Sequence, residues 1–93
     1  MLYSWDEDKR EANLIKHGFD FADAHLVYEN PAKMTLASQR RGETRKMDIA
    51  FVGITGTVVA LVYIERGNDI RVISLRRASR GERRRYAAAK EQN

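Results

Sequence analysis

Arginine is the residue type with the clearest chemical potential in this chain, and it is concentrated in the last third of the sequence. A guanidinium group stays charged at any working pH, and its planar fork can bind two oxygens of one phosphate. Such groups can grip a polyanion or stabilise the charge of a phosphorane. Two arginines at the ends of expected strands, Arg76 and Arg66, are the leading catalytic candidates. Arg71 and Arg45 come next, as candidates for binding phosphates.

Cleavage of RNA without a metal ion also needs a base for the 2′-hydroxyl and an acid for the leaving 5′-oxygen. His17 is the best single acid or base, since imidazole titrates near neutral pH. A histidine just before a glycine is equally typical of a helix end, so both interpretations stay open. Tyr86 could stack on a base or touch the scissile phosphate, although a tyrosine on a short amphipathic helix more often packs against a core.

Three further residues could assist. Lys9 and Lys16 could contact phosphates, although isolated lysines are ordinary on a surface. Glu43 could act as a base or pair with Arg45 or Arg41, and pairing is the commoner role. Two histidines eight residues apart and no cysteine give no metal-ligand spacing, and no phosphate-cradling glycine motif is present. The sequence therefore predicts neither a metal site nor a cofactor.

The first part of the chain predicts a short strand and two helices. The strand covers residues 2–5, and the first helix runs from residue 7 to about residue 17, with Asp6 as its N-cap and Gly18 as its left-handed exit. Its inward face is expected to consist of Ala12, Leu14 and Ile15. A second helix follows over about residues 21–28. Its expected core residues are Phe21, Leu26 and Val27.

The rest of the chain predicts strands and a last helix. A weak strand at residues 33–36 precedes an expected polar loop at residues 37–44. Apolar positions then follow the alternation of strands, separated by glycine turns, which predicts an antiparallel meander. Its three strands cover residues 45–52, 58–64 and 70–76. Ser79 and Glu82 form the capping box of the last helix, which alanines extend to near the C-terminus.

These elements describe a single α+β domain over residues 1–93. It has two N-terminal helices and one C-terminal helix on a mainly antiparallel sheet of four to five strands. If the last two strands pair, Arg66 lies near Arg71 and one strand length from Arg76, so the arginines line a strip. A strip of positive charge suits an extended strand of RNA.

Charge is distributed unevenly along the chain. Residues 1–39 carry four Lys and Arg against seven Asp and Glu, while residues 40–93 carry thirteen against six. We expect the basic part to meet nucleic acid and the acidic part to be free for another partner. The absence of cysteine favours a cytoplasmic protein, and the longest apolar run, Val58 to Ile64, is too short for the ~20 residues of a membrane helix.

The order and spacing of several short motifs resemble one known family across nearly the whole chain. The motifs are Trp5-Asp6, Asn13, Lys16-His17-Gly18, Phe21, Ala24, Asn30-Pro31, Glu43-Thr44-Arg45, Val62-Tyr63, Arg66, Ile70 to Ser74, Arg76, Glu82-Arg83 and Tyr86. They resemble the BrnT toxins of bacterial toxin-antitoxin pairs. The resemblance implies a RelE-like ribonuclease fold, cleavage of RNA and inhibition of translation. In the light of this resemblance, Tyr86 is a catalytic candidate together with Arg76, Arg66 and His17.

The same resemblance implies a partner. The family pattern is a small antitoxin with a ribbon-helix-helix DNA-binding part, two copies of which neutralise two toxins. The complex represses its own operon, and operator DNA is contacted through the antitoxin.

Two alternatives use the same residues without catalysis. A binder of RNA or ribosomes would show strong salt dependence and leave RNA whole. An interaction module would hold a partner protein and leave growth unaffected when expressed alone.

Overall fold

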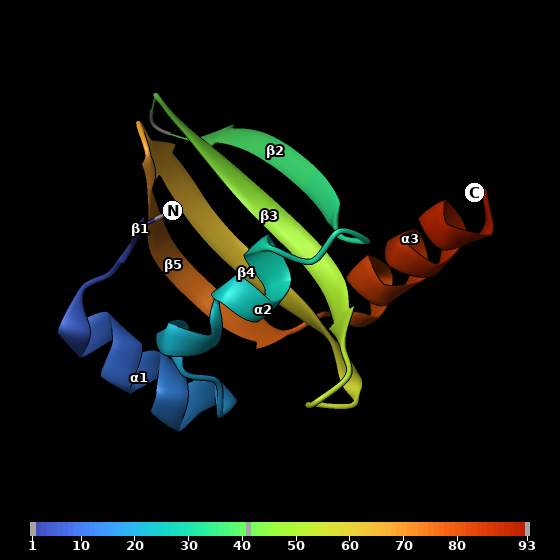
Figure 1. Ribbon diagram of the computed structural model, residues 1–93, viewed down its shortest axis with the longest axis horizontal. Helices are drawn as coiled ribbons and strands as arrows, with labels where there is room; N and C mark the ends of the chain where they lie inside the picture. Colours follow the sequence, from blue (N-terminus) through green and yellow to red (C-terminus); the bar gives the residue numbers. More distant parts are fainter. Residues whose placement is uncertain (1, 41, 93) are drawn as a thin grey trace.

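Five strands form one sheet in the part of the chain that the computed structural model describes, residues 2–40 and 42–92 (Figure 1). The side chains of residues 38–40 and 43 lie outside this description. The spatial order of the strands is β1-β5-β4-β3-β2. Their bounds are Leu2–Ser4 for β1, Met34–Arg40 for β2, Glu43–Val52 for β3, Thr57–Arg66 for β4 and Asp69–Arg77 for β5.

The predicted meander is present, because β3, β4 and β5 pair antiparallel in chain order. The strand β2 extends this antiparallel part on the side of β3. The short strand β1 pairs with the other side of β5 in the parallel direction. The sheet is therefore mixed, and its antiparallel part is limited to the four strands from β2 to β5.

The expected polar loop at residues 37–44 is wrong. Pairing between β2 and β3 continues through Ser38↔Arg45 to Arg40↔Glu43, so only the tip of the hairpin interrupts the strands. Backbone hydrogen bonds between strands do not depend on apolar side chains, and this end of the hairpin projects beyond the helices (Figure 1). Without a core to cover, its polar sequence gave no strand signal.

Three helical segments join β1 to β2, and a fourth helix follows β5. They are α1 (Glu7–His17), the 3₁₀ helix η1 (Phe21–Asp23), α2 (His25–Tyr28) and α3 (Arg80–Glu91). The predicted caps of α1 are confirmed: the Asp6 side chain accepts hydrogen bonds from the Asp8 and Lys9 amides, and Gly18 ends the helix with a φ of 76°.

The single second helix expected over residues 21–28 is instead divided into η1 and α2. Phe21, Ala24 and Val27, which are 1%, 0% and 1% exposed, follow one another at intervals of three residues. The hydrogen bonds from the Asp23 amide to the Asp20 carbonyl oxygen and from the Ala24 amide to the Phe21 carbonyl oxygen span three residues, as in a 3₁₀ helix. Leu26 is only partly buried.

The predicted inward face of α1 is wrong. Leu14 is 42% exposed and Ile15 is 81% exposed, and Ala12 also faces solvent. The buried residue of α1 is Asn13. Its side-chain amide donates to the Leu75 carbonyl oxygen at 2.8 Å, and the Leu75 amide donates back to Asn13 Oδ1 at 3.3 Å.

This contact explains why α1 needs no apolar stripe. The strand β1 covers only Asp69, Ile70 and Arg71 of β5, and α1 lies beside the strand farther along. Asn13 satisfies both backbone groups of Leu75 there. An unpaired strand edge would otherwise leave these polar groups without partners. The Asn13 side chain thus makes the hydrogen bonds that a neighbouring strand would otherwise make.

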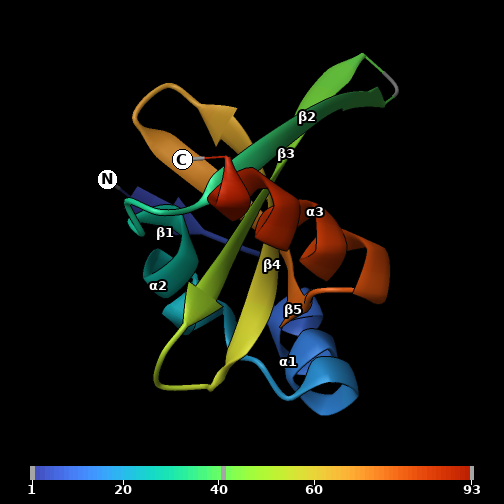
Figure 2. The ribbon, with the colours of Figure 1, turned by 90° about the vertical axis from the view of Figure 1, so that its right-hand side faces the viewer.

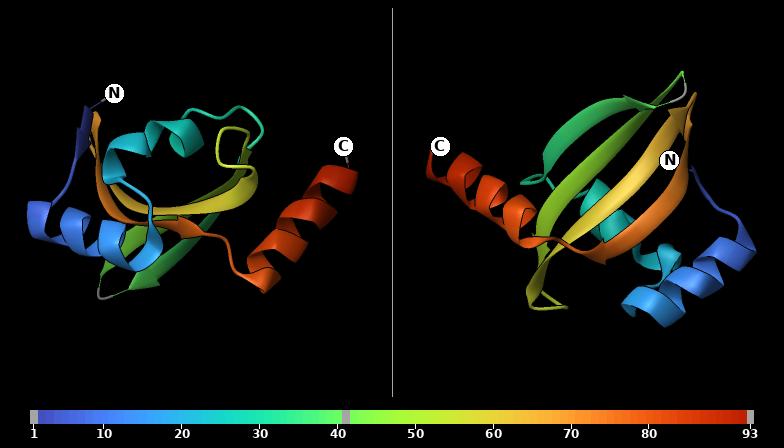
Figure 3. Two further views of the ribbon diagram at one scale, coloured as in Figure 1. Left: turned by 90° about the horizontal axis from the view of Figure 1, so that it is seen from below. Right: turned by 180° about the vertical axis from the view of Figure 1, so that it is seen from behind.

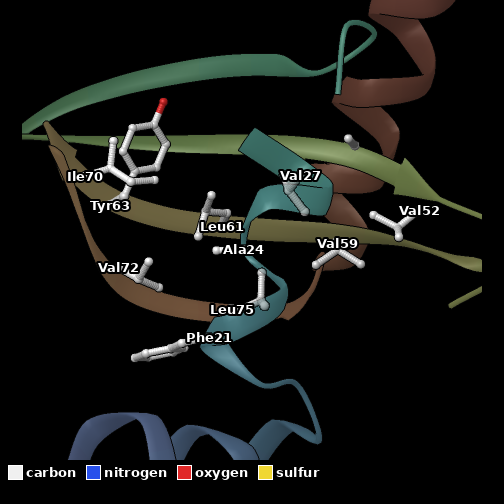
Figure 4. Packing of buried hydrophobic residues seen from close by; sticks show 11 residues of the cluster. Phe21, Ala24, Val27, Val52, Val59, Leu61, Tyr63, Ile70, Val72 and Leu75 are labelled. Atoms are coloured by element: carbon white, nitrogen blue, oxygen red, sulfur yellow. The ribbon is translucent and has the colours of Figure 1, made fainter. Parts of the chain in front are cut away.

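The main core lies between the sheet and the segment η1–α2 (Figures 1 and 4). Figure 4 shows Phe21, Ala24 and Val27 among the side chains that β3, β4 and β5 contribute to the core. These partners include Val59, Leu61 and Tyr63 from β4, and Val72 and Leu75 from β5. Burial of this much apolar surface is the main source of stability for the fold.

A buried polar cluster lies beside this core. The Asp48 carboxylate, 0% exposed, accepts hydrogen bonds from Lys33 Nζ at 2.7 Å, Thr35 Oγ1 at 2.6 Å and the Tyr63 hydroxyl at 3.0 Å. These hydrogen bonds offset the free-energy cost of burying the carboxylate. Burial and the Asp48 carboxylate raise the pKa of Tyr63.

The opposite sheet face is covered only in part. A smaller cluster of Ile49, Ala60, Ala78 and Tyr86 joins this face to α3. The right-hand view of Figure 3 shows this face with α2 behind the strands and α3 extending from one end. Most of this sheet face therefore lies open.

Among the described residues, no helix has the length and the apolar character that a membrane span requires.

Candidate nucleic-acid interface

Three of the predicted arginines project from the open side of β4 and β5. The pairs Arg66↔Asp69, Ile64↔Arg71 and Ala60↔Arg76 set the register. Directly paired residues share a face, and alternate residues of β4 share a face. Ala60 packs with Tyr86 in the smaller cluster. Arg66, Arg71 and Arg76 therefore all lie on the open face, as the strip expected from the sequence requires.

A β-bulge makes this arrangement possible. Val62 pairs with Ser74 and Tyr63 pairs with Val72, so Ile73 is an extra residue in β5. In a regular strand, residues five positions apart point to opposite faces. The bulge shifts the alternation by one residue and returns Arg76 to the face that carries Arg71.

Arg45 joins the same face from β3. Met47 pairs with Val62, and Arg45 lies two residues before Met47. The Nε atom of Arg45 is buried and has no hydrogen-bond partner in the described part of the chain. The same holds for Asp69 Oδ1 at the first position of β5. We call the surface formed by Arg45, Arg66, Arg71 and Arg76 the arginine face.

Arg76 is held in place by the start of α3. Its Nη1 and Nη2 atoms donate to the two oxygens of Glu82 at 2.8 and 3.0 Å. The contact raises the pKa of Arg76, and this contact with Arg76 lowers the pKa of the Glu82 carboxyl to about 2. Glu82 Oε1 also accepts the Ser79 amide at 2.7 Å, which completes the predicted capping box. Arg76 and the beginning of α3 are thus one rigid unit.

Three basic residues of α1 lie beside β5 at the bulge. Lys9, Lys16 and His17 line an open depression of about 240 Å³ together with Ile73, the bulged residue. Partial burial lowers the pKa of His17, and the positive charges of Lys16 and Arg76 lower it further. At neutral pH the imidazole is therefore mostly uncharged and able to accept a proton.

Tyr86 is packed against the sheet. It is 9% exposed, and its ring belongs to the smaller cluster on the sheet. Its hydroxyl oxygen accepts a hydrogen bond from the Phe51 amide at 3.3 Å. The ring therefore packs against β3 and β4, where α3 lies in front of these strands in Figure 2. The geometry favours the packing interpretation of this residue over a contact with the scissile phosphate.

The sequence-predicted residues therefore form two groups with two exceptions. Arg45, Arg66 and Arg71 lie toward the hairpin end of the arginine face, and His17 and the two lysines line the depression at Ile73. Tyr86 stands apart, and the side chain of Glu43 lies outside the described residues. No group of three or more His, Asp or Glu side chains that could hold a metal ion occurs within the described ranges.

Two residues that shape this site had no functional role predicted from the sequence. Ile73 forms the bulge and lines the depression, and its apolar type fits a regular strand equally well. Asn13 appears among the motifs of the family resemblance, and a polar residue on an otherwise apolar stretch of α1 was its one local signal. Its partner Leu75 is 62 positions away, so no local pattern could identify the contact.

The comparison with protein families decides what kind of protein this is. A family described as the ribonuclease toxin BrnT of type II toxin-antitoxin systems matches residues 5–82. The chain belongs to the BrnT family. The matched range of this BrnT toxin includes His17 and the whole arginine face, whereas Tyr86 lies beyond it. No curated protein matches the chain.

Membership establishes the broad function. A BrnT toxin is a ribonuclease toxin of a type II toxin-antitoxin system. Its target is therefore RNA, and its partner is an antitoxin. The arginine face is consistent with this target, because positive charge held on a rigid sheet suits a phosphate backbone.

Proposed function

We propose that this toxin is a metal-independent endoribonuclease whose reaction centre lies where α1 meets β5. The single observation that carries the proposal is that α1 packs on β5 with His17 lining a depression at Ile73, close enough to Arg76 for its positive charge to lower the pKa of His17. A largely uncharged imidazole supplies a base, and a fixed guanidinium supplies positive charge. The RelE-like ribonuclease fold expected from the sequence is part of this proposal.

His17 and Arg76 have separate roles in the proposed step. His17 takes the proton of the 2′-hydroxyl, whose oxygen attacks the adjacent phosphorus. Arg76 stabilises the negative charge of the phosphorane. The bond from phosphorus to the 5′-oxygen breaks, and this oxygen takes up a proton from solvent, while protonated His17 returns its proton to solvent. The products are a 2′,3′-cyclic phosphate and a 5′-hydroxyl, so no water attacks phosphorus and the proposed step uses no metal ion.

The other basic residues position the RNA strand. The partners of Arg71 and Arg76 on β4, Ile64 and Ala60, are four residues apart, about 13 Å along a strand. The two arginines therefore contact different phosphates. Arg45 and Arg66 continue the positive surface toward the hairpin end, and Lys9 and Lys16 add charge beside His17. Tyr86 supports the sheet beneath this path through its contact with Phe51.

The cellular role follows from the substrate. Cleavage of RNA in the cytoplasm inhibits translation, and a cognate antitoxin neutralises the toxin. In line with the family resemblance, the antitoxin carries a ribbon-helix-helix part, and two toxins bind two antitoxins. Operator DNA is contacted through the antitoxin.

Purified toxin free of antitoxin, incubated with a labelled RNA, tests the proposal. We expect internal cleavage of equal rate with EDTA and with added Mg²⁺, and products ending in a cyclic phosphate. The replacement Arg84→Ala removes an exposed arginine of α3 and serves as a control with unchanged rate. Cleavage that requires a metal ion, or products with a 3′-hydroxyl, would contradict the mechanism.

A second candidate function is non-catalytic binding of RNA. The observation that favours it is the pairing of Arg76 with Glu82, because a guanidinium can be held for structural reasons alone. In that case labelled RNA is retained on the toxin with a steep dependence on salt and stays whole in the same experiment.

A further inference from the structure

We propose that Glu82 is a positioning residue for cleavage, which holds Arg76 so that one edge of its guanidinium faces the phosphate. This inference rests on the proposed function of Arg76. It assigns to Glu82 a role beyond the capping of α3. Some N–H groups of Arg76 bind Glu82, and others stay free to bind a phosphate.

The contact uses one edge of the guanidinium. Nη1 and Nη2 of Arg76 bind the two oxygens of Glu82, and Nη1 also donates to the Arg77 carbonyl oxygen at 3.3 Å. A guanidinium has five N–H donors in a fixed plane. The Nε hydrogen and one Nη2 hydrogen remain on the second edge. No acceptor among the described residues is bonded to Arg76 Nε.

This second edge has the geometry for a phosphate. Two parallel N–H groups of one arginine edge fit two oxygens of a phosphate or phosphorane. Because the first edge is occupied, the second edge cannot rotate freely. Glu82 thus fixes the direction in which Arg76 presents its free donors, and such fixed donors are the ones that stabilise charge as it develops.

The Glu82 carboxylate is itself held firmly. It accepts three hydrogen bonds, two from Arg76 and one from the Ser79 amide at 2.7 Å. The Glu82 amide donates to Ser79 Oγ at 3.2 Å, which anchors its backbone. The side chains of Arg76 and Glu82 are 25% and 18% exposed. A carboxylate fixed at a helix start is a better support than one on a mobile loop.

The charge of the Glu82 carboxylate also affects how strongly Arg76 attracts a phosphate. Paired with Glu82, Arg76 keeps its positive charge, and its pKa is raised. The negative charge of the Glu82 carboxylate beside it weakens the attraction of Arg76 to a phosphate at a distance. We therefore expect Glu82 to contribute to kcat through orientation and to contribute little to substrate binding, since an interaction realised only in the transition state changes kcat.

A purely structural role for the pair makes a different prediction. If Glu82 only joins β5 to α3, its loss destabilises the fold and affects activity in proportion, whatever residue occupies position 76. If Glu82 acts through Arg76, its loss has no further effect once Arg76 is gone. A double-mutant cycle separates these cases.

The experiment measures single-turnover cleavage by the full chain as wild type, Glu82→Ala, Arg76→Ala and the double variant. We expect about a 10-fold lower kcat for Glu82→Ala with KM nearly unchanged, and about a 100-fold loss for Arg76→Ala. The double variant should match Arg76→Ala. Thermal unfolding of each variant shows that it is folded at the assay temperature.

Two further variants keep the test valid if Glu82→Ala folds poorly. Glu82→Gln retains an acceptor for the Ser79 amide but loses the two-oxygen contact with Arg76, so we expect it to lower kcat. Ser79→Ala removes the hydroxyl of the capping box and leaves the Arg76 contact in place. It should lower stability and keep kcat within about twofold of wild type, because the guanidinium stays oriented.

The results separate a failure of the role proposed for Arg76 from a failure of the role proposed for Glu82. If Arg76→Ala cleaves as fast as wild type, the proposed function of Arg76 fails. If Arg76→Ala is slow and the loss from Glu82→Ala is fully additive to it, the positioning role fails while the proposed function stands. An unchanged kcat for folded Glu82→Gln would also overturn the positioning role.

Discussion

Arg71 and Arg76 share one face of the sheet although they are five residues apart on the same strand, and the bulge at Ile73 is the reason. Without the extra residue, one of the two guanidinium groups would point into the core beneath α2. With it, Val72 and Leu75 both face that core, and both arginines face the open side. The bulge therefore serves packing and the arginine face at once.

The pH dependence of cleavage should identify His17 as the base. Its neutral form is active, and burial with the charges of Lys16 and Arg76 lowers its pKa below 6.5. Activity is therefore complete at neutral pH and falls as the pH drops through this lowered value. Lys16→Ala removes one positive charge, so the acidic limb of kcat/KM should move to higher pH. A limb that stays in place in both Lys16→Ala and His17→Ala would exclude His17 as its origin.

Replacement of Arg71 tests the path of the RNA across the arginine face. With a 2′-O-methyl RNA that cannot be cleaved, Arg71→Ala should weaken binding and reduce the slope of log K against log salt by about 0.7, the value for one phosphate of a single strand. Arg84→Ala on α3 is the matched loss of charge and should leave the slope unchanged. Equal slopes for Arg71→Ala and wild type would place the RNA elsewhere.

Tyr86→Phe separates packing from chemistry at the residue that the sequence made a catalytic candidate. The change removes only the hydroxyl, which leaves the Phe51 amide without its acceptor. We expect a loss of about 1 kcal/mol in the free energy of unfolding and an unchanged cleavage rate. A large fall in rate with unchanged stability would return Tyr86 to the reaction centre.

Asn13→Ala tests the contact between α1 and the edge of β5. The variant leaves the amide and carbonyl groups of Leu75 without partners in a buried setting. We expect a loss of about 2–3 kcal/mol in the free energy of unfolding, measured by chemical denaturation. Ile15→Ala, on the same helix but 81% exposed, should change stability by less than about 0.5 kcal/mol. Equal effects of the two variants would mean that the amide contact contributes little.

The features that could be predicted from the sequence depend on neighbours in the chain. The caps at Asp6 and Gly18 and the capping box of Ser79 with Glu82 each involve a few consecutive residues. The meander follows from alternation and turn glycines within each strand. The place of Arg66 beside Arg71 could also be predicted, since pairing of β4 with β5 through a short turn fixes it, whereas Arg76 reaches the same face only through the bulge.

The features that could not be predicted depend on contacts across the fold. Asn13 is buried because the edge of β5 needs polar partners, and neither fact is visible in α1 alone. The bulge at Ile73 leaves no mark in an apolar strand sequence. The position of Tyr86 depends on how α3 packs against the sheet. The pairing of Arg76 with Glu82 joins two separately predicted features, a strand end and a helix cap.

The most direct test of the central claim is the single-turnover cleavage rate of Arg76→Ala in EDTA, compared with wild type and with Arg84→Ala. The account predicts that kcat and kcat/KM fall together by about 100- to 1,000-fold, because the guanidinium acts on the charge of the transition state. Arg84→Ala should cleave like wild type. A folded Arg76→Ala variant that cleaves RNA at the wild-type rate would contradict the account.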